Sequence, residues 1–138
     1  MTLENLVRIH ELKREAADKR EFDGLVNAAI ARLTDAENNS LSYASRYDLA
    51  YNASHGLALA ALRASGYRSE KRYLVFQCLI HTTTIDKKYV RLFAACHEKR
   101  NLAEYEGHFD IDEELLDELI SCAKKLKTVV EQIKLNNQ

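Results

Sequence analysis

The sequence predicts an all-α protein, folded as an up-and-down bundle of five to six helices. Three observations support this prediction. The 138 residues include no proline and only 4 glycines, residue types that turn-rich β folds use heavily. Apolar residues make up 46% of the chain, enough to build one core. These residues recur mainly at spacings of three and four, the period of an amphipathic helix.

The first half of the chain is expected to form three helices. The first runs from Thr2 to Ala17, and the second continues from Phe22 to about Asn38. The third is capped by Ser40 and ends before Gly66, whose backbone freedom suits a left-handed stop. Apolar residues surround most of this third helix, which predicts that it lies at the centre of the bundle.

Three further helices are expected in the second half. One spans Ser69–His81, and the next starts at Thr83 or Thr84, runs to about Tyr105 and is ended by Gly107. Asp110 opens the last helix as its N-cap, with Glu113 three residues later as in a capping box. No linker or repeat interrupts the pattern, so residues 1–138 are interpreted as a single domain.

Composition narrows the class of protein. The 20 basic and 21 acidic residues leave a net charge of −1, whereas dedicated nucleic-acid binders usually carry a basic excess. The three cysteines form no CxxC pair, as expected for reduced thiols. The chain shows neither a signal peptide nor a run able to span a bilayer, so a cytoplasmic location is predicted. We expect no cofactor and no metal, because Cys78 and His81 lack a second ligand pair.

Two stretches carry a recognisable pattern. Residues 45–55 read SRYDLAYNASH and residues 98–105 read EKRNLAEY. The first resembles the serine–arginine helix of the HEPN family. The second resembles that family's segment of arginine, alanine, an acidic residue and tyrosine. With the helix that follows, the resemblance covers roughly the last two-thirds of the chain, whereas the first two helices fit by position and pattern only.

The resemblance implies a helical bundle that forms a homodimer through the face carrying the motif. It further implies a small prokaryotic protein of a toxin–antitoxin type of system, partnered by a minimal nucleotidyltransferase. Nucleotide and RNA are the ligands that it suggests. Arg100, Asn101 and Tyr105 would then lie near the shared cleft as ligand-binding residues.

Active HEPN ribonucleases carry an arginine and, after four to six residues, a histidine. Arginine stabilises the charge of the reacting phosphate, and histidine transfers protons near neutral pH, so that RNA is cleaved without a metal. Arg100 and Asn101 match the start of this pattern, but Tyr105 stands where histidine is expected. Since tyrosine has a pKa near ~10, it is a poor base at neutral pH. We therefore favour a binding function over catalysis.

A catalytic alternative uses His97. Arg91 and His97 have a suitable spacing, although their position relative to the tyrosine motif differs from that of the family. If the chain is a ribonuclease, Arg100 or Arg91 would act with His97. The structural alternative makes His97 a core histidine on the side of Phe93.

Polar residues also interrupt the apolar third helix. Asp48, Asn52 and His55 follow at spacings of four and three and share one face, with Arg46 nearby in the sequence. They are interpreted first as a hydrogen-bond network that fixes helix packing. The alternative is that Arg46, Asp48 and His55 bind ligand in the same cleft as Arg100.

Simple structural roles are also predicted for several charged and aromatic residues. Arg100 and Glu104 have the spacing of a helical ion pair, and Tyr105 suits a packing role with its hydroxyl at the surface. A basic cluster with two tyrosines is expected to be a solvated helix end, with base stacking as the alternative. Its members are Arg63, Tyr67, Arg68, Lys71, Arg72 and Tyr73.

Three functions therefore remain open from the sequence. The favoured one is a HEPN-like protein that binds a nucleotide, RNA or a partner protein. The second is a metal-independent HEPN ribonuclease. The third is a purely structural helical dimer.

Overall fold

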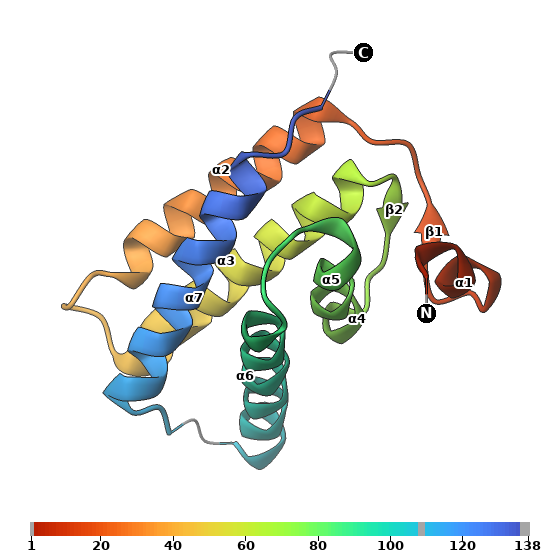
Figure 1. The fold of residues 1–138 in the computed structure, drawn as a ribbon. Helices are drawn as coiled ribbons and strands as arrows, with labels where there is room; N and C mark the ends of the chain where they lie inside the picture. Colours follow the sequence, from red (N-terminus) through yellow and green to blue (C-terminus); the bar gives the residue numbers. More distant parts are fainter. Residues whose placement is uncertain (1, 108–109, 136–138) are drawn as a thin grey trace.

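The computed structural model describes residues 2–107 and 110–135, and these residues form seven helices and one two-stranded sheet (Figure 1). The prediction of an all-α helical bundle is confirmed. The helices are α1 (Leu3–Arg8), α2 (Lys19–Ala36), α3 (Tyr43–Ala64), α4 (Arg72–Gln77), α5 (Leu79–Thr82), α6 (Lys87–Glu106) and α7 (Glu113–Glu131). The strands are β1 (Lys13–Arg14) and β2 (Tyr67–Arg68), which pair antiparallel.

α3 is the central helix, as its apolar circumference predicted. It packs against α2 and α7 on one side and against α4, α5 and α6 on the other (Figure 1). α2 runs antiparallel to α3, and α7 runs in the same direction as α3. Small residues such as Ala50, Ala53 and Ala61 are fully buried along α3, so neighbouring helices can approach its backbone closely.

The predicted apolar stripe of α2 is its buried face. Phe22, Val26, Ala29 and Leu33 are at most 8% exposed and recur at the expected spacing. α7 buries a similar stripe from Leu116 to Val130. Within the described residues, none of the helices combines the length and apolar character that a bilayer crossing requires.

Helix boundaries in the second half differ from the prediction. Residues 69–81 do not form one helix, because the chain bends at Cys78 between α4 and α5. α6 begins after Asp86, whose carboxylate accepts from the Lys88 amide at 2.9 Å. Thr83 instead stabilises the preceding turn, where its hydroxyl donates to the Leu79 carbonyl at 2.9 Å.

Two predicted caps were placed two residues too early. Ser42, rather than Ser40, caps α3 by accepting from the Ser45 amide at 3.1 Å. Asp112, rather than Asp110, caps α7 by accepting from the Leu115 amide at 2.8 Å. The predicted glycine stops are present, since Gly66 and Gly107 follow α3 and α6 with φ of 92° and 80°.

The N-terminal segment is not the long helix predicted from Thr2 to Ala17. α1 ends at Arg8, and His10 adopts a φ of 64°, which turns the chain toward β2. Pairing of β1 with β2 and burial of Leu12, which is 3% exposed, outweigh the local helical pattern. We refer to residues 2–14 as the N-terminal arm.

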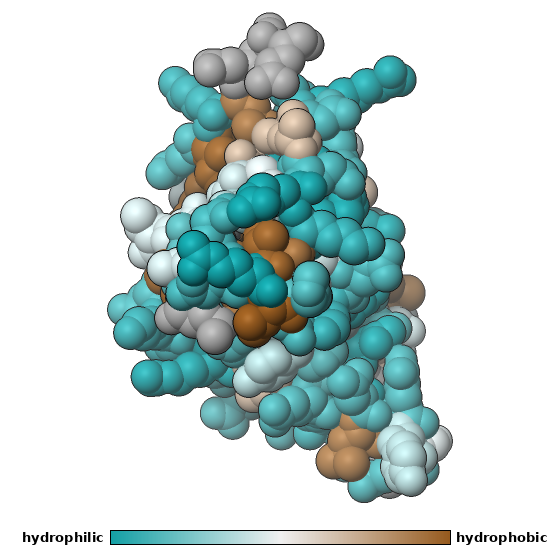
Figure 2. All heavy atoms as spheres, turned by 90° about the vertical axis from the view of Figure 1, so that its right-hand side faces the viewer, coloured by the Kyte–Doolittle hydropathy of each residue, from teal (hydrophilic) through white to brown (hydrophobic). Residues whose placement is uncertain are grey.

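Ionic contacts hold the N-terminal arm to the bundle. Glu4 pairs with Arg14 and accepts from the Tyr67 hydroxyl at 2.6 Å, while Glu11 pairs with Lys71. The side on which the arm lies is mostly hydrophilic, with small apolar patches (Figure 2). Ile9, which is 53% exposed, is one of the apolar residues that the arm leaves accessible.

Arg63 anchors the end of α3 from the inside. Its side chain is 2% exposed and donates to Glu21 at 2.6 Å and to the Glu15 and Ala16 carbonyls at 2.7 Å. Arg68 binds the carboxylates of Glu15 and Glu21. Arg63 is therefore buried, so the prediction of a solvated helix end is wrong for this residue. Arg68 is partly exposed, as predicted, but it is paired with carboxylates.

Candidate functional site

Polar side chains from α3, α4 and α6 converge on one side of α3. We call them the α3–α6 polar cluster, defined as Asp48, Tyr51, Asn52, Arg72, His97, Arg100 and Asn101. The cluster joins the first half of α3 to the middle of α6, because Arg100 binds Asp48 and His97 binds Tyr51.

α6 presents its three members on one helical face, because His97, Arg100 and Asn101 follow at spacings of three and four. The preceding half of α6 is anchored by buried Val90, Phe93 and Cys96. The Cys96 carbonyl accepts from the Tyr47 hydroxyl at 2.8 Å, which fixes α6 against α3 just before His97.

His97 lies in a chain of hydrogen bonds. Its Nδ1 is 2.7 Å from the Tyr51 hydroxyl, and its Nε2 is 3.0 Å from Nδ2 of Asn101. With the Asn101 amide donating to Nε2, the neutral imidazole carries its proton on Nδ1 and donates to Tyr51. Tyr51 is fully buried, so this pair connects the core to the surface of α6.

Two arginines from different helices surround Tyr51. The guanidinium carbons of Arg72 and Arg100 lie 5.6 Å and 5.0 Å from the centroid of its ring, within cation–π range. Arg100 donates to Asp48 at 3.1 Å and pairs with Glu104 at 3.2 Å, which confirms the predicted ion pair.

Arg72 has a different environment from Arg100. It donates to the neutral side-chain oxygen of Asn52 at 2.9 Å. Across residues 2–107 and 110–135, no carboxylate forms an ion pair with Arg72. The positive charge of Arg72 is therefore less compensated by nearby carboxylates than that of Arg100.

The electrostatic potential at His97 is positive. Burial lowers the pKa of His97, and the charges of Arg72 and Arg100 lower it further, against the opposing effect of Glu98. Burial also raises the pKa of Tyr51, although both arginines favour its ionised form. The cluster thus holds a neutral imidazole and a neutral phenol between two cations.

His55 is partly buried next to the cluster. Burial, followed by the charges of Arg72 and His97, lowers its pKa to about 4. Its ring meets Phe76 edge-on at 6.0 Å, and among the described residues its buried Nε2 finds no hydrogen-bond partner. His55 therefore behaves as a neutral core residue next to the cluster.

Several residues singled out from the sequence do meet in the structure. Asp48 contacts Arg100, and Asn101 contacts His97. The structural alternative for His97 agrees with the structure in part, because both of its ring nitrogens bind polar groups within the chain, although the side chain is half-buried rather than in the core.

Other candidates lie outside the cluster. Arg46 is buried on another side of α3, where it donates to the Ala36 carbonyl at 2.7 Å and so stabilises the end of α2. Tyr105 is 93% exposed, which rules out the predicted packing role. Arg91 is exposed on α6.

The role of Tyr51 and the partners of Arg72 were not evident from the sequence patterns. Arg72 was grouped with neighbouring cations, and two of these, Arg68 and Lys71, bind carboxylates of the N-terminal segment. The period of α3 offered a signal, because Tyr51 lies between Asp48 and Asn52 on the same side of the helix.

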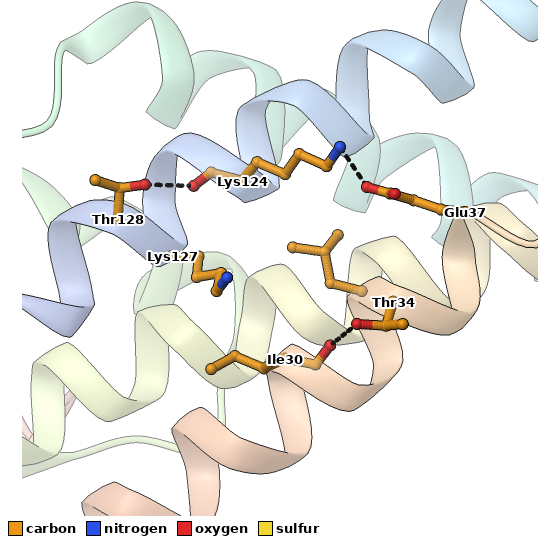
Figure 3. Close-up of a pocket in the computed structure, with 7 residues that line it drawn as sticks. Ile30, Thr34, Glu37, Lys124, Lys127 and Thr128 are labelled. Carbon is orange, nitrogen blue, oxygen red and sulfur yellow. Dashed lines mark hydrogen bonds and ion pairs between the residues drawn. The ribbon is translucent and has the colours of Figure 1, made fainter.

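A groove of about 250 Å³ between α2 and α7 is an alternative location (Figure 3). Several of its polar groups are already used within the chain. Lys124 pairs with Glu37, and the Thr34 hydroxyl donates to the Ile30 carbonyl at 3.0 Å. The part of the chain that the structure describes contains no group of three or more residues able to hold a metal ion.

No protein-family model, curated protein or solved structure matches this chain. The chemistry of the site therefore has to be argued from its own residues and distances.

Proposed function

We propose that this chain is a HEPN-like binding protein whose α3–α6 polar cluster binds the phosphate group of a nucleotide or of RNA. The observation that carries the proposal is the pair formed by Arg72 and Arg100, whose guanidinium groups come from different helices and both lie within cation–π range of one tyrosine ring. Planar guanidinium groups are the preferred partners of phosphate oxygens. The resemblance of residues 98–105 to the HEPN segment supports the same function.

The neighbours of the arginines suit this role. Asn101 offers an amide at the surface, and the Tyr51 hydroxyl holds the ring of His97 in place. Since Arg72 forms no ion pair within the described residues, a phosphate would supply the anion that it lacks. Asp48 competes for Arg100 and sets its orientation before ligand arrives.

The test is a binding titration with a fluorescent single-stranded RNA octamer and with AMP. Arg72→Gln and Arg100→Gln should each weaken binding about tenfold or more, because each removes a charge-assisted hydrogen bond. Arg91→Gln is the matched control, since it removes an exposed arginine of α6 outside the cluster. Equal losses in all three variants, or none in any, would rule out a specific site here.

A ribonuclease is the second candidate, and the proximity of His97 and Arg100 favours it. In this arrangement, however, both imidazole nitrogens are engaged, by Tyr51 and by Asn101. A general base needs a free nitrogen within reach of the 2′-hydroxyl. Asn101 would therefore have to swing away before His97 could act.

RNA cleavage in EDTA separates binding from catalysis. We expect the purified protein to leave RNA intact. Cleavage that persists in EDTA and is lost in both His97→Ala and Arg100→Ala would replace the binding proposal by the ribonuclease. Arg91→Ala would show whether Arg91 takes the place of Arg100.

We also propose, on the resemblance alone, that the chain forms a homodimer and works with a minimal nucleotidyltransferase. Tyr105 is 93% exposed and so is accessible to such an enzyme. Transfer of AMP from ATP to its hydroxyl would release pyrophosphate. Mass spectrometry of the protein after incubation with this enzyme and ATP tests the step, with Tyr105→Phe as the control.

A further inference from the structure

Tyr73 extends the α3–α6 polar cluster to the surface. It directly follows Arg72 in α4, and its ring centroid lies 6.1 Å from that of His97, tilted by 52°. The side chain is 45% exposed, although it is a large aromatic group. Tyr73 therefore offers an open apolar ring beside the two arginines.

The ring of Tyr73 is the outermost member of an aromatic series. His97 stacks on Tyr51 at 6.1 Å and 21°, and Tyr51 meets Phe76 at 5.9 Å. The inner rings are held by core packing and by the Tyr51–His97 hydrogen bond. Because its inner neighbours are fixed, Tyr73 has a rigid support on one side and solvent on the other.

A nucleotide combines the two groups that this surface would hold. Its phosphate carries the charge that the arginines attract, and its base is a flat ring that stacks on tyrosine. Arg72 lies over the Tyr51 ring, and Tyr73 lies against the His97 ring. These two rings are joined by a hydrogen bond, so both side chains border the cluster and could contact the two ends of one nucleotide unit. A duplex hides the faces of its bases, which leaves an unpaired nucleotide as the ligand.

We infer that Tyr73 is the stacking surface for an unpaired nucleobase whose phosphate lies at Arg72 and Arg100. This inference rests on the proposed function and adds the recognition of the base to it. Tyr43 and Tyr105 are also exposed, at 42% and 93%, but Tyr43 lies near Glu113 of α7 rather than near the cluster. Tyr43 therefore serves as the matched control.

The experiment compares AMP with ribose 5-phosphate by isothermal titration calorimetry. The two ligands share the sugar and the phosphate and differ in the base. We expect the wild-type protein to bind AMP about tenfold more tightly, in line with the usual strength of base stacking on an aromatic side chain. Tyr73→Ala should remove this advantage, whereas Tyr73→Phe and Tyr43→Ala should retain it.

The outcomes separate the two proposals. Equal binding of AMP and ribose 5-phosphate, or an AMP advantage that survives Tyr73→Ala, would overturn the stacking role and leave phosphate binding intact. Failure of both ligands and of an adenylate octamer to bind would overturn phosphate binding and stacking together. Tighter binding of the octamer than of AMP would identify single-stranded RNA, rather than a free nucleotide, as the source of the stacked base.

Discussion

The hydroxyl of Tyr51 lies 2.7 Å from Nδ1 of His97 and joins the fully buried middle of α3 to the accessible half of α6. The imidazole is oriented by this bond on one side and by Asn101 on the other. Both arginines of the cluster lie over the same tyrosine ring, so Tyr51 positions three side chains.

Tyr51→Phe should separate this positioning role from simple packing. The ring keeps its volume, and loss of one hydrogen bond should lower the free energy of unfolding by about 1 kcal/mol. Binding of AMP should weaken as well, because His97 loses its support. Tyr47→Phe is the control, since Tyr47 is equally buried and donates to the Cys96 carbonyl. Urea unfolding should show similar losses of stability in the two variants, whereas calorimetry should show weaker binding in Tyr51→Phe alone.

Stability should decrease as the pH falls below neutrality. The pKa of His55 is lowered from 6.5 to about 4, and that of His97 is lowered too, so the unfolded chain binds more protons than the folded one between these values. The free energy of unfolding should therefore be nearly constant well above pH 6.5 and fall by on the order of 3 kcal/mol toward pH 4. Urea titrations across this range provide the measurement.

Variants identify the histidine responsible. His55→Leu should flatten most of this pH dependence, and exposed His81→Gln should leave it unchanged. Carboxylates such as Glu4 and Glu21, whose pKa values lie below 4.5, contribute only at lower pH. A profile that His55→Leu does not alter would contradict the assignment.

Asp48→Asn should strengthen anion binding. Asp48 partly neutralises Arg100 at 3.1 Å, and asparagine keeps the shape of the side chain while removing its charge. Since this ion pair is half-exposed, the gain in AMP affinity should be modest, about threefold. Asp23→Asn on α2, which removes a carboxylate paired with Lys19, should not change the affinity. Weaker binding in Asp48→Asn would show that orientation of Arg100 outweighs its free charge.

Arg63→Ala should destabilise the fold strongly. The guanidinium is 2% exposed, and its removal leaves the Glu15 and Ala16 carbonyls without its hydrogen bonds and Glu21 paired with Arg68 alone. Breaking a buried ion pair from one side costs about 3–5 kcal/mol. Arg32→Ala, at an exposed position of α2, should cost little. Thermal and urea unfolding of both variants test this expectation, and similar midpoints would contradict it.

The parts of the fold that the sequence predicted are those decided by local patterns. The stripe of α2 and the central position of α3 follow from residue spacing, and the stops at Gly66 and Gly107 follow from backbone freedom. The N-terminal arm was not predictable in this way. Its strand and its ion pairs with residues 67–71 depend on contacts between segments about 50 residues apart in the sequence.

In the candidate site, too, the residues within local motifs were predictable, and those that depend on contacts between helices were not. Arg100, Asn101 and Asp48 were found through motifs that lie within single helices. The contribution of Tyr51 and Arg72 depends on how α3, α4 and α6 cross, which no local pattern contains. Arg46 was predicted to bind ligand because it lies near the motif in the sequence. In the structure it instead donates to the Ala36 carbonyl, which is a structural bond.

The burial of α6 is uneven along its length. Val90, Phe93 and Cys96 are its buried residues, whereas the residues from His97 to Glu106 are all partly or fully exposed. Amides in this second half should thus open by local fraying far more often than those of α3. A ligand that bridges Arg72 and Arg100 would fasten the free end of α6 to α4, so that occupancy of the site and helical order in residues 97–106 would rise together.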